Sequence, residues 1–190
     1  MSGTERLVVV TGGPGAGKTT LIEELSRRGV ATAPEAGRAV IRAQRASGRT
    51  GLPWADRALF AELMAFHDIA SHKAALASQG IVVFDRAIPD LIGYLRLCDL
   101  PVPAALHAAA HRLRYRARVF AAPPWRTIYE NDADHRQDFD EACRTYEAVT
   151  GAFRDYRYDL CPLPLVGVAE RADFLLAHIG GEPHSVAAKG

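Results

Sequence analysis

Cysteine is scarce in this chain of 190 residues, whose three cysteines lie far apart, at Cys98, Cys143 and Cys161. Their odd number and wide spacing exclude a dense disulfide framework and a close pair of cysteine metal ligands. The simplest interpretation is a reducing compartment, so we expect a cytoplasmic protein. The chain also lacks a run of about 18 apolar residues, which excludes a membrane-spanning helix.

Neither sign of charge dominates the chain. The 23 lysine and arginine residues face 22 aspartate and glutamate residues, which gives a net charge of +1. This balance exerts no broad attraction on nucleic acid or an anionic membrane, so we expect neither as a partner. One basic run, residues 112–118, could contact nucleic acid. However, it leads directly into an apolar segment, and the rest of the chain balances its charge.

The most informative pattern lies near the N-terminus, where Gly12 is followed by four residues and then by Gly17-Lys18-Thr19. An apolar run at residues 7–10 precedes this pattern and a helix-forming run follows it. A strand, a glycine-rich loop and a helix in this order are typical of the phosphate-binding P-loop, whereas a glycine-rich turn with a stray lysine is the weaker interpretation. The predicted nucleotide-binding residues are Gly12, Gly13, Pro14, Gly15, Ala16, Gly17, Lys18, Thr19 and Thr20.

Each residue type in this loop has a physical role. Gly12, Gly15 and Gly17 allow backbone angles that are closed to other residues, so the loop amides can point at phosphate oxygens. The positive end of the following helix adds to the attraction. Lys18 is expected to reach the β- and γ-phosphates, and the Thr19 hydroxyl is expected to bind Mg²⁺.

Apolar runs alternate with helical patterns along the chain, which predicts an α/β domain built on a parallel sheet. The expected strands are residues 7–10, 30–33, 80–84, 118–122 and 164–168. The expected helices are residues 18–28, 36–46, 53–78, 90–98, 103–114, 139–156 and 169–179, the third with an apolar stripe of Leu59, Leu63, Phe66 and Ile69. Residues 1–180 are expected to form one domain, and residues 181–190 a flexible tail.

Charged residues follow two of the expected strands. Asp85 ends an apolar strand, as the metal-positioning carboxylate of P-loop proteins does, although an aspartate that caps a turn is the alternative. Motors that hydrolyse ATP usually follow this aspartate with glutamate. Here the next residue is Arg86, a donor suited to a phosphoryl group or to a strand-end ion pair. Glu35 ends the second strand and could accept a proton from an attacking hydroxyl, or serve only as a helix-start carboxylate. Arg38 lies on the first turn of the helix that Glu35 opens.

A polar segment, residues 123–138, follows the fourth strand and breaks the apolar periodicity. It suits a lid that closes over phosphates, with Arg126 and Arg136 offsetting the transferring charge. The alternative is a solvated helix and loop with internal ion pairs. His67 and His72, five residues apart on a long helix, lack the spacing of helical metal ligands and are read as ordinary residues.

Four motifs in this order resemble the P-loop ATPase and kinase family typified by the ribosylnicotinamide kinase domain of bacterial NadR: residues 12–19, 34–38, 84–86 and 128–136. The resemblance implies a three-layer α/β/α sandwich with a five-stranded parallel sheet and a lid. The Asp85-Arg86 pair is also similar to a pair in thymidylate and deoxynucleoside kinases. A carboxylate after the second strand is the base in those enzymes, and it corresponds to Glu35.

We therefore expect a cytoplasmic, Mg²⁺-dependent kinase that transfers the γ-phosphoryl group of ATP to a nucleoside, nucleotide or similar small molecule. A non-kinase nucleotide-binding regulator and a plain ATPase are the alternatives. GTP specificity lacks support, because residues 131–134 fit only part of the guanine motif. The acceptor and the oligomeric state stay open. The expected catalytic residues are Lys18, Glu35, Asp85, Arg86, Arg126 and Arg136, with Thr19 and Asp85 as metal ligands.

Overall fold

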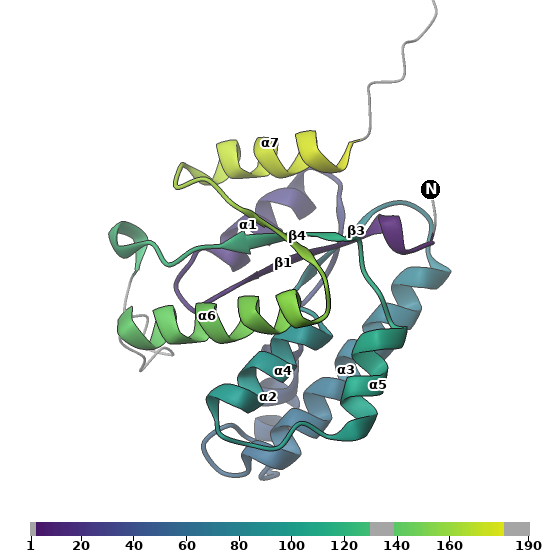
Figure 1. Cartoon of the computed structure of the whole chain (residues 1–190), viewed down its shortest axis with the longest axis vertical. Helices are drawn as coiled ribbons and strands as arrows, with labels where there is room; N and C mark the ends of the chain where they lie inside the picture. The colour runs from purple at the N-terminus through teal and green to yellow at the C-terminus, as the bar shows by residue number, and fades with distance from the viewer. Residues whose placement is uncertain (1–2, 130–138, 181–190) are drawn as a thin grey trace, which may run out of the picture.

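Five parallel strands form one sheet at the centre of the molecule, in the order β2-β3-β1-β4-β5 (Figure 1). The computed structural model describes residues 3–129 and 139–180. The N-terminal strand is central because its residues are apolar on both faces. The strands are β1 (Leu7–Gly12), β2 (Ala31–Ala33), β3 (Val82–Asp85), β4 (Arg118–Ala122) and β5 (Asp159–Pro162).

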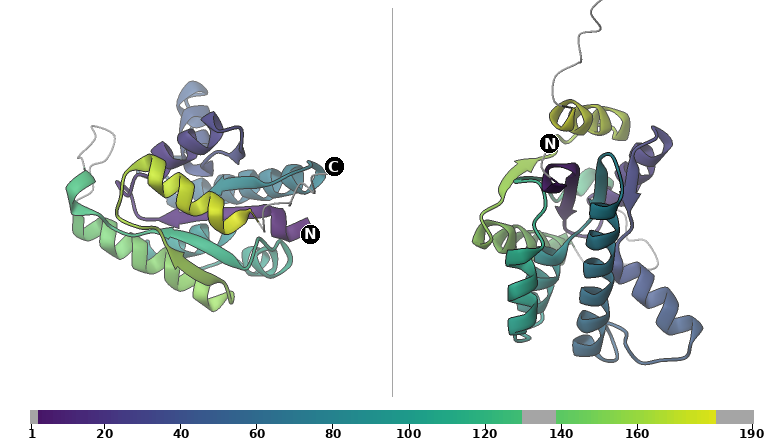
Figure 2. Two further views of the ribbon diagram at one scale, coloured as in Figure 1. Left: turned by 90° about the horizontal axis from the view of Figure 1, so that it is seen from above. Right: turned by 90° about the vertical axis from the view of Figure 1, so that its right-hand side faces the viewer.

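Helices cover both faces of this sheet, which makes the fold a three-layer α/β/α sandwich, as expected. The helices are α1 (Lys18–Arg27), α2 (Ala36–Ala46), α3 (Arg57–Ala77), α4 (Ile88–Leu97), α5 (Ala104–Arg112), α6 (Phe139–Asp155) and α7 (Val168–Ile179). Figure 1 shows α1 and α7 on one side of the sheet and α3 to α6 on the other. The right-hand view of Figure 2 shows the same separation of α7 from α3 and α5.

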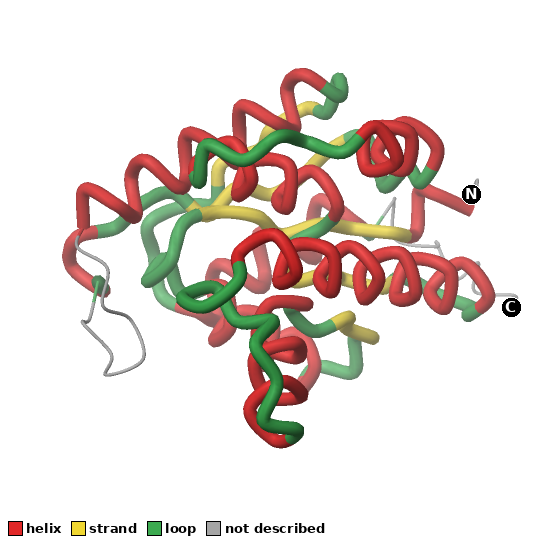
Figure 3. Tube along the Cα trace, turned by 90° about the horizontal axis from the view of Figure 1, so that it is seen from below, coloured by secondary structure: helices red, strands yellow, loops and turns green. Residues whose placement is uncertain are grey.

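Alternate residues of β1 hold the two helical layers in place. Leu7 and Val9 are fully buried in a cluster with side chains of α3, α4, α5 and α6. Val8 and Val10 face the opposite way, into a second cluster with residues of α1 and α7. In the view from below, helices lie on both sides of the strands (Figure 3). Because the strands are parallel, their carboxyl ends meet at one edge, where the loops that follow β1, β3 and β4 come together.

The fifth strand is the one strand that we predicted at the wrong place. It lies at Asp159–Pro162, whereas residues 164–167 form a loop that leads to α7. β5 pairs only with β4, so it is an edge strand and needs few apolar side chains. Its two end residues are exposed. The apolar run that follows marks a partly covered loop instead, and Pro164 within it has no backbone N–H for a strand ladder.

The predicted apolar stripe of the long helix is also wrong in part. Phe66 is 77% exposed, and the buried face of α3 instead contains Ala61, His72 and Ala75. The helix begins at Arg57 rather than at residue 53, because the Asp56 carboxylate caps it by accepting a hydrogen bond from the Leu59 amide at 3.0 Å. The other three stripe positions, at 59, 63 and 69, are partly buried.

Two expectations of the sequence concern features outside the helices and strands. The three cysteines are free, as their spacing predicts. Within residues 3–129 and 139–180, no helix is both long and apolar enough to cross a membrane. The tail at 181–190 lies outside the described residues.

Candidate functional site

The loop between β1 and α1 has the backbone geometry that a phosphate-binding loop needs. Gly12 has a φ of +141°, and a side chain there would collide with the Ala122 carbonyl of the neighbouring strand β4. Gly17 has a φ of 72° and forms the N-cap of α1, with no side chain capping the helix. The first amides of α1 therefore remain free to bind an anion at the positive end of the helix.

Lys18 is buried against this loop, and the residue as a whole is 7% exposed. Its ammonium group donates a hydrogen bond of 2.5 Å to the Gly13 carbonyl. Burial lowers the pKa of Lys18 to about 8, helped by the nearby Arg86 and opposed by the carboxylates of Asp85 and Glu35. A lysine with this pKa is still mostly charged at neutral pH and lies next to the space that the loop encloses.

Glu35 and Arg86 form an ion pair between the ends of neighbouring strands. Ala33 of β2 pairs with Phe84 of β3. Glu35 and Arg86 each lie two residues further along the chain, so this register brings them together. Arg86 Nε donates to Glu35 Oε1 at 3.0 Å, while Arg38 Nε lies 3.1 Å from Glu35 Oε2. Burial raises the pKa of Glu35, but the charges of Arg86, Lys18 and Arg38 outweigh it and hold the pKa below its usual range.

Arg86 itself has an unusual backbone, with a φ of 71° in a residue other than glycine. Its amide donates to the Val10 carbonyl of β1 at 3.0 Å, so the chain turns sharply as soon as β3 ends. Such conformations are costly and often occur at functional sites, where the surrounding structure holds them. This turn directs the guanidinium group toward Glu35 and also to within 3.4 Å of Asp90 Oδ1.

Asp90 is a residue of the site that the sequence analysis treated only as a helix start. It is 4% exposed and lies in the first turn of α4. Thr11 of β1 donates its hydroxyl hydrogen to Asp90 Oδ1, and the Ala87 amide donates to Oδ2 at 2.9 Å. Asp90 therefore ties the end of β1 to the turn that carries Arg86. No spacing rule predicts a hydrogen bond between residues 79 positions apart.

Asp85 is buried at the end of β3, in register with Val10 of β1. Within the described residues, its Oδ1 atom has no hydrogen-bond partner. Burial raises the pKa of Asp85, and the neighbouring charge of Lys18 offsets only part of this effect. A buried carboxylate oxygen without a partner requires a compensating cation or donor, which fits the metal-positioning role predicted for this residue.

Asp68 of α3 is a second carboxyl group that the sequence analysis missed. It is partly buried, and burial together with the negative charges of Asp90 and Glu35 raises its pKa to about 8. A signal was present in the sequence, because residue 68 lies seven positions after Ala61 and four before His72, on the buried face of the helix. A carboxyl group on such a face indicates a polar site rather than core packing.

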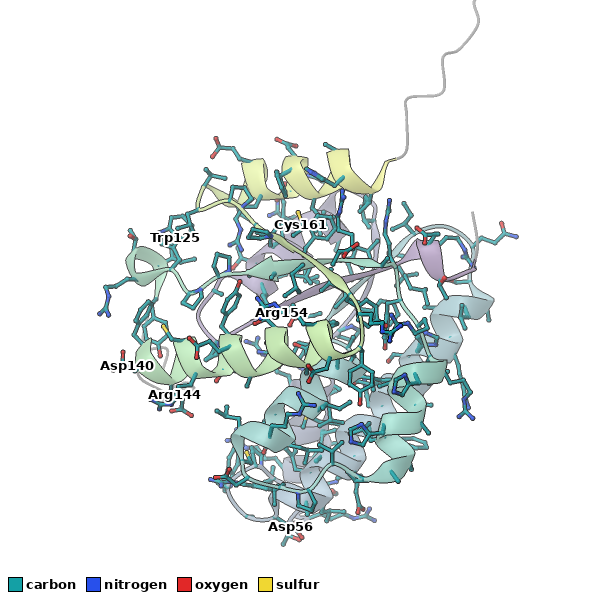
Figure 4. All side chains as sticks on the ribbon, viewed as in Figure 1. Asp56, Trp125, Asp140, Arg144, Arg154 and Cys161 are labelled. Atoms are coloured by element: carbon teal, nitrogen blue, oxygen red, sulfur yellow. The ribbon has the colours of Figure 1, made fainter. Side chains whose placement is uncertain are left out.

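The segment after β4 reaches the phosphate loop through its apolar side chains. Figure 4 shows Trp125, which precedes the 3₁₀ helix Arg126–Ile128, at the edge of the sheet. A Cβ atom added to Gly15 would lie 2.5 Å from the Tyr129 ring, so this ring covers the loop. Arg126 instead stacks on the Phe139 ring, with its guanidinium carbon 4.1 Å from the ring centroid.

The structure thus groups the phosphate loop, Lys18, Glu35, Asp85 and Arg86 at one edge of the sheet. Arg126 lies on the same edge but pairs with an aromatic ring. Arg136 and most of the expected lid, residues 130–138, lie outside the described residues. No three histidine, cysteine, aspartate or glutamate side chains among the described residues are grouped as a self-sufficient metal site.

Comparisons with known proteins identify the family of the chain. Residues 7–171 match the AAA domain family, and the chain belongs to that family. The comparison with curated proteins gave no match. The P-loop family expected from the sequence motifs is therefore confirmed, over nearly the whole of the described chain.

Several solved structures share the fold. NadR in complex with NR has a TM-score of 0.68 at 17% identity, covering 97% of this chain and 54% of NadR. Deoxyadenosine kinase from M. mycoides has a TM-score of 0.64 at 11% identity, covering 91% of this chain and 98% of that one. Thymidylate kinase from Ehrlichia chaffeensis has a TM-score of 0.59 at 14% identity, covering 91% and 97%. At these identities the likeness shows the fold, and the chain spans about half the length of NadR.

Proposed function

We propose that this protein is a Mg²⁺-dependent kinase that transfers the γ-phosphoryl group of ATP to a hydroxyl group of a nucleoside, nucleotide or similar small molecule. The observation that carries the proposal is the Glu35–Arg86 ion pair, held beside the phosphate loop by the β2–β3 register. A protein that only bound nucleotide would not need a partly buried, ionised carboxylate next to the phosphate site. A transferase needs one to orient and deprotonate an acceptor.

The residues on the nucleotide side would bind and position ATP. The loop amides and the positive end of α1 would hold the phosphates, and Lys18 would move from the Gly13 carbonyl to the β- and γ-phosphates. Thr19 and Asp85 are oxygen donors of the kind that Mg²⁺ prefers, and Asp85 Oδ1 has no other partner among the described residues. Mg²⁺ held there with phosphate oxygens would offset the charge that develops on the transferring group.

The acceptor side would be served by Glu35 and Arg86. The acceptor hydroxyl oxygen would attack the γ-phosphorus atom while its proton passes to a Glu35 oxygen. The bond from the γ-phosphorus to the β–γ bridging oxygen would then break and ADP would leave. Glu35 is ionised at neutral pH because its pKa is low, and each of its oxygens has a lone pair left after pairing with Arg86 and Arg38. Arg86 orients the carboxylate and adds positive charge near the transferred group.

The direct test is to find the acceptor. Thermal-shift measurements with ATP, GTP and a panel of nucleosides and nucleotides should show stabilisation by two ligand classes, ATP and an acceptor. Mass spectrometry of the mixture should then show an acceptor that has gained a phosphoryl group and an equal amount of ADP. Stabilisation by nucleotide alone, with no phosphorylated product across the panel, would favour a nucleotide-binding regulator instead.

Asp85→Asn should weaken the dependence on Mg²⁺ more than the binding of ATP itself. Asparagine keeps the shape but lacks the charge, so we expect the Mg²⁺ concentration for half-maximal activity to rise about 10- to 100-fold. Calorimetric titration of ATP in the presence of EDTA should give nearly the parental affinity. Asp99→Asn is the matched control, because Asp99 is exposed at the end of α4. An unchanged Mg²⁺ requirement would make Asp85 a structural turn residue.

ATP affinity should also fall at high pH because of Lys18. Its pKa of about 8 in the free protein means that the lysine is charged below pH 8 and becomes neutral as the pH rises above it. Binding to phosphate requires the charged form, so affinity should be constant below pH 8 and fall by up to about tenfold per pH unit above it. Calorimetry from pH 6.5 to 9.5 measures this, and an affinity independent of pH would contradict the assignment of Lys18.

A further inference from the structure

Arg171 of α7 is a buried cation without an anionic partner among the described residues. It is 4% exposed, although arginine is rarely buried to this extent unless it is paired with a carboxylate. Its Nη1 atom donates to the Ala16 carbonyl at 3.0 Å, and its Nε atom is buried with no hydrogen-bond partner in the described part of the chain. Burial lowers its pKa, and no carboxylate within residues 3–129 and 139–180 acts to raise it.

The surroundings of Arg171 make this burial more costly. Ala16 and Gly17 belong to the phosphate loop, and a Cβ atom added to Gly17 would lie 2.9 Å from Arg171 Nη1. The guanidinium group therefore touches the loop where α1 begins, at the positive end of that helix and one residue from Lys18. An uncompensated buried charge is strongly destabilising. Because the described residues offer Arg171 no carboxylate, a bound anion is the partner that this position suits.

A second arginine shows what a purely structural link between the same helices looks like. Arg28 follows α1 and pairs with Asp173 of α7 at 2.5 Å and with Glu24 at 2.6 Å. It also donates to the Ala169 carbonyl at 3.2 Å, so it joins α1 to α7 at the end remote from the phosphate loop. Arg28 thus has two carboxylate partners, whereas Arg171, its counterpart at the loop, has a single carbonyl.

We propose that Arg171 is a positioning residue for polyphosphate binding. Its guanidinium group fixes the Ala16 carbonyl, so that the loop amides face the phosphates. The bound polyphosphate in turn balances the charge of Arg171. The proposal rests on nucleotide binding by the phosphate loop, as set out above. The part of the nucleotide that Arg171 would help to bind is the phosphate chain and not the base. The effect of Arg171 should therefore be the same for ATP and for inorganic tripolyphosphate, and α7, which closes one face of the sheet, becomes part of the nucleotide site.

The test compares Arg171→Gln with Arg28→Gln by calorimetric titration with Mg²⁺-ATP and with tripolyphosphate. Loss of a hydrogen bond from a charged group predicts affinities weaker by roughly 10- to 100-fold for both ligands in Arg171→Gln. Arg28→Gln should bind both as the parent does, although it too removes a cation between α1 and α7. The binding of Arg171→Gln should also depend less on salt than that of the parent, a readout that loss of packing alone would not move.

Arg171→Lys covers the case in which the glutamine variant does not fold. Lysine keeps the charge but loses the planar fork, so this variant should bind tripolyphosphate more weakly than the parent while keeping the parental salt dependence. Parental affinity in Arg171→Gln would overturn the role of Arg171 but not the proposed function. If only Arg171→Lys folds, parental affinity in that variant would have the same meaning. So would a loss confined to ATP, which would indicate contact with the base. If the parent itself binds neither ligand, the proposed function fails, and the role of Arg171 fails with it.

Discussion

Replacing Lys18 by alanine is expected to abolish tight triphosphate binding while leaving the fold intact. Removing one partner of a buried, hydrogen-bonded charge pair typically costs about 2–5 kcal/mol, which predicts an ATP affinity weaker by roughly 30- to 5,000-fold. The fold should survive, because the lysine is desolvated in the free protein and its one hydrogen bond is to the Gly13 carbonyl. Calorimetric titration measures the affinity, and thermal unfolding measures the stability.

Lys73→Ala provides the matched control for this variant. Lys73 is an exposed residue of α3, so its removal changes the net charge by the same amount without touching the loop. It should bind ATP as the parent does. In Lys18→Ala the fall of ATP affinity above pH 8 should also disappear, because no other group of the loop titrates there. Equal ATP affinity in Lys18→Ala and the parent would refute the assignment of the phosphate loop.

Replacing Glu35 by glutamine is expected to lower phosphotransfer by about 10²- to 10⁴-fold, the usual contribution of a general base. Glutamine keeps the size and one oxygen for the Arg86 hydrogen bond, but it cannot take a proton from the acceptor. Glu35 follows β2, which β3 separates from β1, and it is not part of the phosphate loop, so ATP affinity should be close to that of the parent. The rate is followed by mass spectrometry of the phosphorylated product, alongside calorimetry with ATP.

Glu62→Gln is the control, since Glu62 is an exposed carboxylate on α3. It should turn over at the parental rate. Near-parental turnover in Glu35→Gln would remove Glu35 from the chemistry and leave Asp85 as the candidate base. A variant that loses ATP affinity and turnover together would instead indicate that the Glu35–Arg86 pair shapes the nucleotide site, and the kinase proposal would lose its main support.

The candidate site residues that the structure brings together belong to local motifs. The phosphate loop carries its own signature, and Asp85 and Arg86 follow a strand that is apolar on both faces. Placing Glu35 in the site also requires that the second and third strands are neighbours in the sheet. The pairing of Ala33 with Phe84 shows that they are. Parallel strands align their carboxyl ends, so residues that follow two neighbouring strands meet without any further signal.

The parts that could not be predicted depend on contacts between distant segments. The Thr11–Asp90 hydrogen bond joins two residues whose types are common in helix starts and turns, and no periodicity connects them. Asp68 was missed because the apolar stripe was assigned around Phe66, which lies about 120–180° around the helix from the buried Ala61, His72 and Ala75. β5 was misplaced because an edge strand that pairs on one side carries little apolar signal.

The position of β1 in the sheet has a consequence for how the chain is made. Its first residue, Leu7, pairs with Val82, so the nearest partner strand emerges 75 residues later (82 − 7 = 75), and the strand on its other side, β4, later still. At a synthesis rate of about 5–20 residues per second, the most apolar strand of the protein waits roughly 4–15 seconds without a partner. During that time it is an unpaired, uncharged β-segment, the kind that aggregates or engages chaperones. A nascent chain halted before β4 would carry a complete phosphate-loop sequence on a strand with one open edge.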